Sequence, residues 1–264
     1  MEHYETIFLE SNGPVAVLTL ARKEVHNAMN ILMIRELTHA FDSLNRRDEI
    51  RIILLRGEGE HFSSGADLNW MRAGTEQSRE ELLSESRELA ALFRHIQRSG
   101  HVVVAAVQGK VMGGANGLVA ASDIVVAEEN AWFAFSEVRL GLIPATIAPY
   151  VLTKIGYSRT AEWMLTGRLF DAREALVAGL VHVVSGEGRL KETAHALIRD
   201  LLSNGPAAMK GVKSMLNTLE KPDDPDRIVD YTAELIARYR TSEEGQEGIS
   251  AFFEKRRPGW YETY

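Results

Sequence analysis

The sequence contains no cysteine, and this absence removes several kinds of chemistry at once. Disulfide bonds, cysteine-ligated zinc sites and thiol nucleophiles are all excluded. The longest apolar runs, such as the one at 102–107, are far too short to span a membrane. The opening segment MEHYETIFLE lacks the basic and long apolar regions of a signal peptide. We therefore expect a cytoplasmic protein with no membrane partner.

Positive charge is also in short supply. The 264 residues include 30 Lys and Arg against 37 Asp and Glu, which gives a net charge of −7. Because no broad basic field is available, we expect no nucleic-acid partner. An anionic ligand would need a local basic patch instead. The histidines have no metal-ligand spacing, so we predict no metal site.

Strand and helix patterns alternate in the first part of the chain, and helical patterns alone follow. Short β-rich runs predict strands at 6–10, 15–20, 50–55, 102–107, 123–127, 131–135 and 180–184. Apolar periodicity predicts helices at 30–46, 76–99, 145–155, 159–165 and 172–178, the first capped by Asn30. This order predicts an α/β core at 1–190 and a C-terminal helical region at 191–264.

Two loops rich in small residues follow buried strands. The first, EHFSSGAD at 60–67, would let a ligand approach the backbone closely, although taken alone the segment favours a plain surface loop. The second, QGKVMGGANG at 108–117, leads from a strand into a helix, where free N–H groups face an anion. Tight packing through glycine is the alternative for this second loop.

A third segment, FAFSEVRLGLIPATIAP at 133–149, places Glu137 between aromatic and apolar residues. Apolar surroundings raise the pKa of a carboxyl group, which suits proton transfer near neutral pH. An ion pair with Arg139 is the alternative reading, and we expect Trp132 to belong to the core. Together, the three segments predict a site that stabilises an enolate while a proton moves on neighbouring carbons.

At these residues the sequence closely resembles the crotonase superfamily, the enoyl-CoA hydratase/isomerase family. The resemblance runs through RKEVHNAM, FSSGADL, VQGKVMGGANGLVAASDIVVA, FSEVRLGLIP, LTGRLFDAREALVAGLV and FFEKRRPGW, in that order. It implies an α/β fold, a crotonase-like spiral of ββα turns with a C-terminal α-helical trimerisation region. It also implies an acyl-CoA substrate, no cofactor beyond the CoA of that substrate, and a homotrimer or a dimer of trimers.

The resemblance also assigns roles to individual residues. It gives Ala66 and Gly114 the backbone N–H groups of an oxyanion hole, and Glu137 the catalytic carboxylate. Contacts to CoA are expected around these two loops, from Arg22, Lys23, Ala28, Ser64, Ala66, Asp67, Leu68, Gly113 and Gly114. Lys255 in FFEKR is a further candidate for CoA binding, either within its own subunit or to the CoA of a neighbouring subunit. For the three basic residues, a solvated surface position is the alternative.

One departure from the family pattern bears on the reaction. Typical hydratases carry a first glutamate where this chain has Gly117, so Glu137 is the one carboxylate retained. We expect a 2-enoyl-CoA hydratase in which the gap at Gly117 admits water or a branched acyl chain. Local similarity to bacterial methylglutaconyl-type hydratases implies a carboxylated substrate that meets Arg139, and a pair of Arg139 with Glu137 or another acidic side chain of the protein is the alternative. A 3,2-enoyl-CoA isomerase with Glu137 as sole base, or a non-catalytic acyl-CoA binding protein, are the alternatives.

Overall fold

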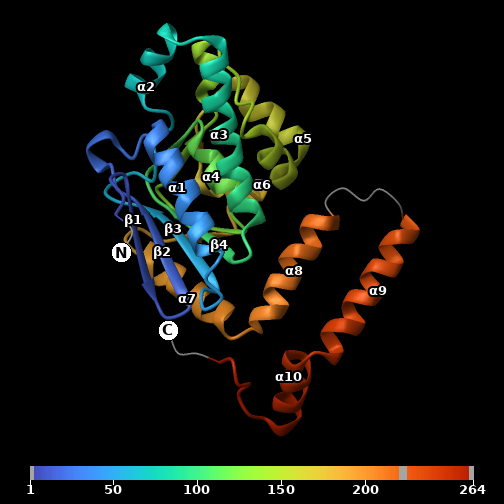
Figure 1. The fold of residues 1–264 in the computed structure, drawn as a ribbon. Coiled ribbons are helices and arrows are strands. Elements are labelled where there is room, and N and C mark those ends of the chain that lie inside the picture. The colour runs from blue at the N-terminus through green and yellow to red at the C-terminus, as the bar shows by residue number, and fades with distance from the viewer. Residues whose placement is uncertain (1–2, 220–224, 262–264) are drawn as a thin grey trace. The chain divides into compact units, whose positions relative to one another are not determined.

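The computed structural model describes residues 3–219 and 225–261, which form two compact units (Figure 1). The units are Met1–Ala194 and His195–Tyr264. The sequence predicted the boundary a few residues earlier, between 190 and 191. Helix α7 (Leu190–Leu202) contains both division points. The candidate catalytic residues Ala66, Gly114 and Glu137 all belong to the N-terminal unit.

The N-terminal unit is built on a six-stranded sheet. Its strands run in the order β1-β2-β3-β4-β6-β9, and all neighbours except β1 and β2 are parallel. These are β1 (Ile7–Asn12), β2 (Val15–Leu20), β3 (Ile52–Gly57), β4 (Val102–Val107), β6 (Ile124–Glu128) and β9 (Val183–Ser185). Since β3 and β4 are parallel neighbours, the loops that follow them leave the sheet at the same edge.

A second sheet has three short strands, β5 (Lys110–Met112), β7 (Trp132–Ala134) and β8 (Phe170–Asp171). Along the chain, β4 of the first sheet is followed by β5 of the second sheet, and β6 of the first sheet is followed by β7 of the second. Helix α4 (Ala115–Ala121) or the 3₁₀ helix η3 (Ser136–Leu140) comes next. The mixed α/β architecture predicted from the sequence is confirmed.

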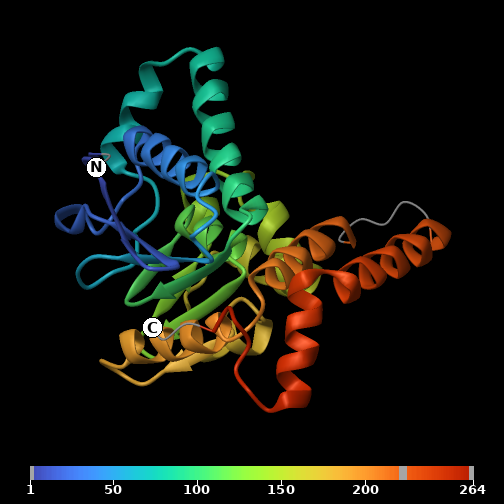
Figure 2. The ribbon, with the colours of Figure 1, turned by 60° about the horizontal axis from the view of Figure 1, so that its bottom comes forward.

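Helices α1 (Ile31–Leu44) and α3 (Arg79–Arg98) lie side by side in both views (Figures 1 and 2). Asn30 caps α1 as predicted, because its side chain accepts a hydrogen bond from the Met33 N–H. The buried face of α1 consists of Met33, Ile34, Leu37, Ala40, Phe41 and Leu44. The other helices of this unit are η1 (Lys23–Val25), α2 (Leu68–Ala73), η2 (Gly74–Glu76), α5 (Ala148–Thr166) and α6 (Ala172–Ala178).

The structure differs from the local predictions at α2 and at Trp132, and agrees with them within α5. Helix α2 was not anticipated, and it begins where Asp67 accepts hydrogen bonds from the N–H groups of Asn69 and Trp70. The break predicted between the helices at 145–155 and 159–165 is confirmed, because α5 consists of two helical stretches separated at Gly156, whose φ is 71° and ψ 169°. Trp132 is not in the core: its side chain is 47% exposed, since it lies on the outward side of β7 while Phe133 points inward.

The C-terminal unit is helical, as predicted. After α7 it contains α8 (Pro206–Leu219), α9 (Pro225–Thr241) and α10 (Glu243–Glu254). Helix α10 packs against both α8 and α9. No helix within 3–219 and 225–261 is both long and apolar enough to cross a membrane.

Candidate active site

The two small-residue loops are in direct contact. Ser63 donates its N–H to the Lys110 carbonyl at 3.1 Å, and the Met112 N–H donates to the Ser63 carbonyl at 3.1 Å. Gly65 has φ of 92°, and a Cβ placed there would lie 2.6 Å from the Met112 carbonyl oxygen. Only glycine therefore fits at this position, both for backbone conformation and for space.

The backbone on either side of Ala66 pairs with Met29, and this pairing directs the Ala66 N–H to the opposite side of the loop. The Met29 N–H donates to Gly65 O at 2.7 Å, and the Asp67 N–H donates to Met29 O at 2.9 Å. Because this parallel bridge uses the groups that flank Ala66, the Ala66 N–H points away from Met29. Among the described residues it has no acceptor, and the same is true of the Gly114 N–H ahead of α4. Both residues are partly accessible to solvent.

Glu137 lies beside the glycine turn that precedes α4. A Cβ placed on Gly113 would lie 3.2 Å from Oε1 of Glu137, so the missing side chain makes room for the carboxylate. Oε2 of Glu137 is buried and has no hydrogen-bond partner among the described residues. Burial raises the pKa of this carboxyl group, against a smaller lowering effect of its own backbone N–H. The side chain therefore suits a proton acceptor that works near neutral pH.

Asn116 holds the glycine turn in place, a role that the sequence did not reveal. Its fully buried amide donates from Nδ2 to the carbonyls of Val111, Gly113 and Ala134, at 3.0–3.2 Å. The Gly113 N–H also donates to Ala134 O at 2.8 Å. These bonds tie the turn before α4 to the end of β7, from which Glu137 follows. An Asn second in a helix, after two glycines, is the signal that would have indicated this support.

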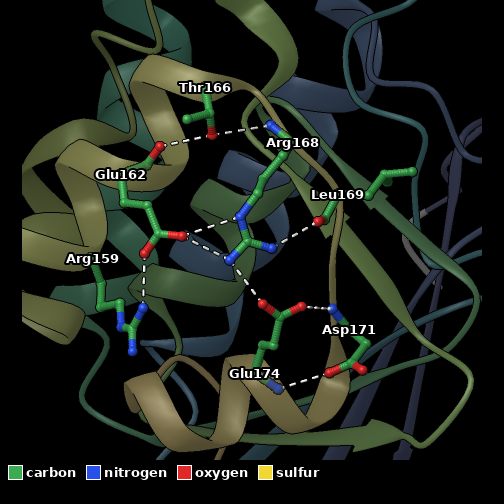
Figure 3. Close-up of polar contacts among 7 residues, drawn as sticks. All are labelled: Arg159, Glu162, Thr166, Arg168, Leu169, Asp171 and Glu174. Carbon is green, nitrogen blue, oxygen red and sulfur yellow. Dashed lines mark hydrogen bonds and ion pairs between the residues drawn. The ribbon is translucent and has the colours of Figure 1, made fainter.

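An ion-pair network surrounds the turn at Gly167, which packs against η3. A Cβ on Gly167 would lie 3.1 Å from Val138 and 3.3 Å from Nε of Arg139, so this turn touches the residues after Glu137. Figure 3 shows Arg168 between two carboxylates, with 2.8 Å contacts to Glu162 of α5 and to Glu174 of α6. The network thus joins the helices on either side of the turn.

Comparison with known proteins identifies the family. The sequence profile described as Enoyl-CoA hydratase/isomerase matches residues 10–263. An enoyl-CoA hydratase of Shewanella pealeana superposes with a TM-score of 0.92 and 42% identity, over 97% of this chain and 96% of that one. An enoyl-CoA hydratase/isomerase of Marinobacter aquaeolei gives a TM-score of 0.91 and 34% identity, over 97% and 99%. The short-chain-enoyl-CoA hydratase of Clostridium acetobutylicum is 30% identical over 257 residues, 95% of either chain.

The chain belongs to the enoyl-CoA hydratase/isomerase family. The resemblance to the crotonase superfamily drawn from the sequence is thereby confirmed, as is the crotonase-type fold. Members of this family act on acyl-CoA substrates as hydro-lyases or isomerases.

At Gly117, where typical hydratases carry their first glutamate, neighbouring side chains occupy the space. A Cβ on Gly117 would lie 2.5 Å from Cζ of Phe93 and 2.5 Å from Cγ2 of Ile147, both of them buried side chains. The expectation of a gap here that admits water or a branched chain is therefore wrong. Since Phe93 and Ile147 are distant in sequence, no local pattern around Gly117 could reveal them.

The predicted CoA-binding residues near the N-terminus already have partners within the protein. Arg22 forms an ion pair with Asp67 at 2.9 Å and donates to the Ala28 carbonyl. Lys23 pairs with Glu58 at 2.6 Å, but its side chain is largely exposed. Burial raises the pKa of Asp67, but the hydrogen bonds from Arg22 and from backbone N–H groups outweigh it, so the pKa lies below its usual value. Arg22 and Asp67 thus hold the first loop together.

The remaining predicted contacts differ in accessibility. Ala28 is buried, Ser64 is partly buried, and Leu68 is exposed at the start of α2. Lys255 ends α10 in the C-terminal unit, with a left-handed backbone at φ of 55°. A role of these four residues in CoA binding stays a prediction.

Arg139 does not form the ion pair with Glu137 that we considered. The guanidinium is exposed, its Nε lies near Gly167, and no acidic side chain in the described part of the chain pairs with it. The raised pKa of Glu137 follows from burial, and no cation among the described residues lowers it.

Proposed function

We propose that this protein is a 2-enoyl-CoA hydratase that uses Glu137 as its one catalytic carboxylate. The observation that carries the proposal is the position of Glu137: its carboxylate lies beside Gly113, the residue before Gly114, and neither its buried Oε2 nor the Gly114 N–H has a hydrogen-bond partner in the described part of the chain. Hydratase names among the similar proteins agree with this assignment. The N–H groups of Ala66 and Gly114 would both donate to the thioester oxygen.

In the proposed reaction, these two N–H groups stabilise the negative charge that develops on the thioester oxygen. The Glu137 carboxylate takes a proton from water while the water oxygen bonds to C3 and the C2–C3 π bond opens. The resulting enolate collapses as the same carboxyl group returns the proton to C2. One carboxylate therefore suffices, because it acts first as base and then as acid.

Replacement of Glu137 by Gln tests the assignment, because it preserves shape and removes the proton acceptor. We expect kcat to fall on the order of 10²–10⁴-fold with little change in KM. The assay follows the loss of the conjugated enoyl-thioester absorbance, with the hydroxyacyl-CoA product identified by mass. Glu192→Gln, at an exposed position in α7, is the matched control. A Glu137→Gln variant that turns over at the wild-type rate would rule out the proposed role.

Isomerisation is the second candidate, and the packing at Gly117 favours it. Phe93 and Ile147 leave no room there for a second carboxylate, and a single base can carry a proton from C2 to C4. Conversion of a 3-enoyl-CoA to its 2-enoyl isomer, with no water addition to 2-enoyl-CoA, would support the isomerase. Turnover of either substrate excludes a protein that merely binds acyl-CoA.

We also propose that the preferred substrate carries a second carboxylate, as a glutaconyl-type thioester does. Arg139 supports this, because its exposed guanidinium lies two residues after Glu137 and has no acidic partner in the described residues. A charged hydrogen bond contributes about 1.5–3 kcal/mol. Arg139→Gln should therefore lower kcat/KM for 3-methylglutaconyl-CoA by roughly 10–100-fold and leave that for crotonyl-CoA unchanged. Arg173→Gln, at an exposed position in α6, is the control, and an equal loss on both substrates would contradict the proposal.

A further inference from the structure

The motif RKEVHNAM contains a fully buried asparagine, Asn27, whose side-chain oxygen and nitrogen are both hydrogen-bonded. Oδ1 of Asn27 accepts from the backbone N–H of Arg22 at 2.9 Å. Nδ2 donates to the carbonyls of Glu58 at 2.8 Å and His61 at 2.9 Å. One side chain therefore joins the segment before α1 to the loop after β3, which carries Ala66.

The backbone at this point is strained. His26 and Asn27 both have φ of 54°, and neither is glycine. Left-handed backbone is unfavourable for residues with a Cβ, although Asn tolerates it better than most. Such conformations persist where surrounding contacts over-determine them, and they concentrate at functional sites. Here the bonds of the Asn27 amide supply those contacts.

A short chain of hydrogen bonds runs from Asn27 to the predicted oxyanion donor. The Ser63 hydroxyl donates to Asn27 O at 2.8 Å, and the Gly65 N–H donates to Oγ of Ser63 at 3.2 Å. On the other side of Asn27, the His26 carbonyl accepts from the Ser64 N–H at 2.9 Å. The left-handed turn thus fixes the three residues that precede Ala66.

We propose that Asn27 is a positioning residue for catalysis: it holds the left-handed turn that aims the Ala66 N–H at the thioester oxygen. This inference rests on the proposed function, since it needs Ala66 to be an oxyanion donor. Asn27 itself touches no substrate and acts through Ser63 and Gly65. A displacement of about 1 Å in a catalytic group can cost about 100-fold in rate.

Two variants loosen the turn to different degrees. Asn27→Asp keeps the acceptor for Arg22, but it replaces both amide donations with a carboxylate oxygen facing two carbonyls. Ser63→Ala removes only the hydroxyl link and leaves the Asn27 amide intact, so its fold is the safer of the two. Asn45→Ala is the control, because Asn45 also makes two side-chain hydrogen bonds, to Ser99 and Gly100, away from the site.

The readout is the polarisation of the ligand carbonyl, which a purely structural residue would not alter. Butyryl-CoA labelled with ¹³C at the thioester carbonyl is unreactive, and donors in an oxyanion hole lower its stretching frequency in difference infrared spectra. We expect the full shift in wild type and in Asn45→Ala. Asn27→Asp and Ser63→Ala should show a smaller shift, with kcat about 10–100-fold lower and KM nearly unchanged.

Each outcome is decisive. If folded Ser63→Ala and Asn27→Asp keep both the full shift and the wild-type kcat, the positioning role of Asn27 is overturned. Ser63→Ala alone carries the test if Asn27→Asp does not fold. A wild-type protein that binds butyryl-CoA with no shift has no oxyanion hole, and that result overturns the proposed function together with this inference.

Discussion

The packing around Gly117 leads to a prediction about stability. Alanine in place of a helical glycine normally stabilises a protein by about 1 kcal/mol. At Gly117, however, the new Cβ would lie 2.5–2.6 Å from two ring atoms of Phe93 and 2.5 Å from Ile147. Ordinary carbon contacts are about 3.5–4.0 Å, so buried neighbours would have to move by about 1 Å. Overpacking of this kind costs about 1–3 kcal/mol.

We therefore expect Gly117→Ala to lower the free energy of unfolding by about 1–2 kcal/mol, since overpacking outweighs the gain in helix propensity. Urea denaturation measures the difference. Gly74→Ala is the control, because its Cβ would come no closer than 3.3 Å, to the exposed side chain of Leu82. That variant should differ from wild type by less than about 0.5 kcal/mol.

A double-mutant cycle isolates the contact responsible. In the Phe93→Leu background the ring atoms that crowd Gly117 are gone, so Gly117→Ala should cost less there. The coupling energy should be about 0.5–3 kcal/mol. A Gly117→Ala variant as stable as wild type, or equally destabilised in both backgrounds, would refute the account of why this position has no glutamate.

Two further predictions concern carboxylates of the site. Glu137→Gln should be more stable than wild type at pH 7, because burial raises the pKa of Glu137 and the folded protein disfavours its ionised form. This advantage over wild type should grow as the pH rises through the raised pKa and vanish below about 4.5. Urea denaturation of both proteins at pH 4 and at pH 7 measures it. A variant and a wild type of equal stability at pH 7 as well as at pH 4 would contradict the prediction. Asp67→Ala should lose about 1–3 kcal/mol, since α2 loses its cap and Arg22 its partner. The contribution of Asp67 to stability should decrease as the pH falls through the lowered pKa of this residue. A stability difference between wild type and Asp67→Ala that does not change with pH would refute this.

Local patterns in the sequence predicted those features that local physics determines. The cap at Asn30 and the apolar periodicity after it indicated α1, and the β-rich run at Val102–Val107 matched β4. The resemblance to a known family assigned roles to Ala66, Gly114 and Glu137, and these roles stay predictions. The structure adds the contacts between the loops that carry them.

What the sequence did not reveal depends on contacts between distant segments. Phe93 and Ile147 come from α3 and from the residue before α5, yet both meet Gly117. The left-handed backbone of His26 and Asn27 gave no signal either, because glycine is the usual mark of that conformation. In each case a tertiary contact overrides the local preference, and the overriding residues lie around the proposed site.

The proposed site gathers several features that oppose stability. The buried Oε2 of Glu137 has no hydrogen-bond partner within 3–219 and 225–261, and His26 and Asn27 are held in left-handed conformations. Each would relax if its surroundings allowed it: the carboxylate by pairing with a cation, the turn by adopting an extended backbone. The exposed Arg139 lies two residues from Glu137 and does not pair with it. Such a pair would hold the pKa of Glu137 low and weaken it as a base. The separation of these two charges is therefore what the proposed proton transfer requires.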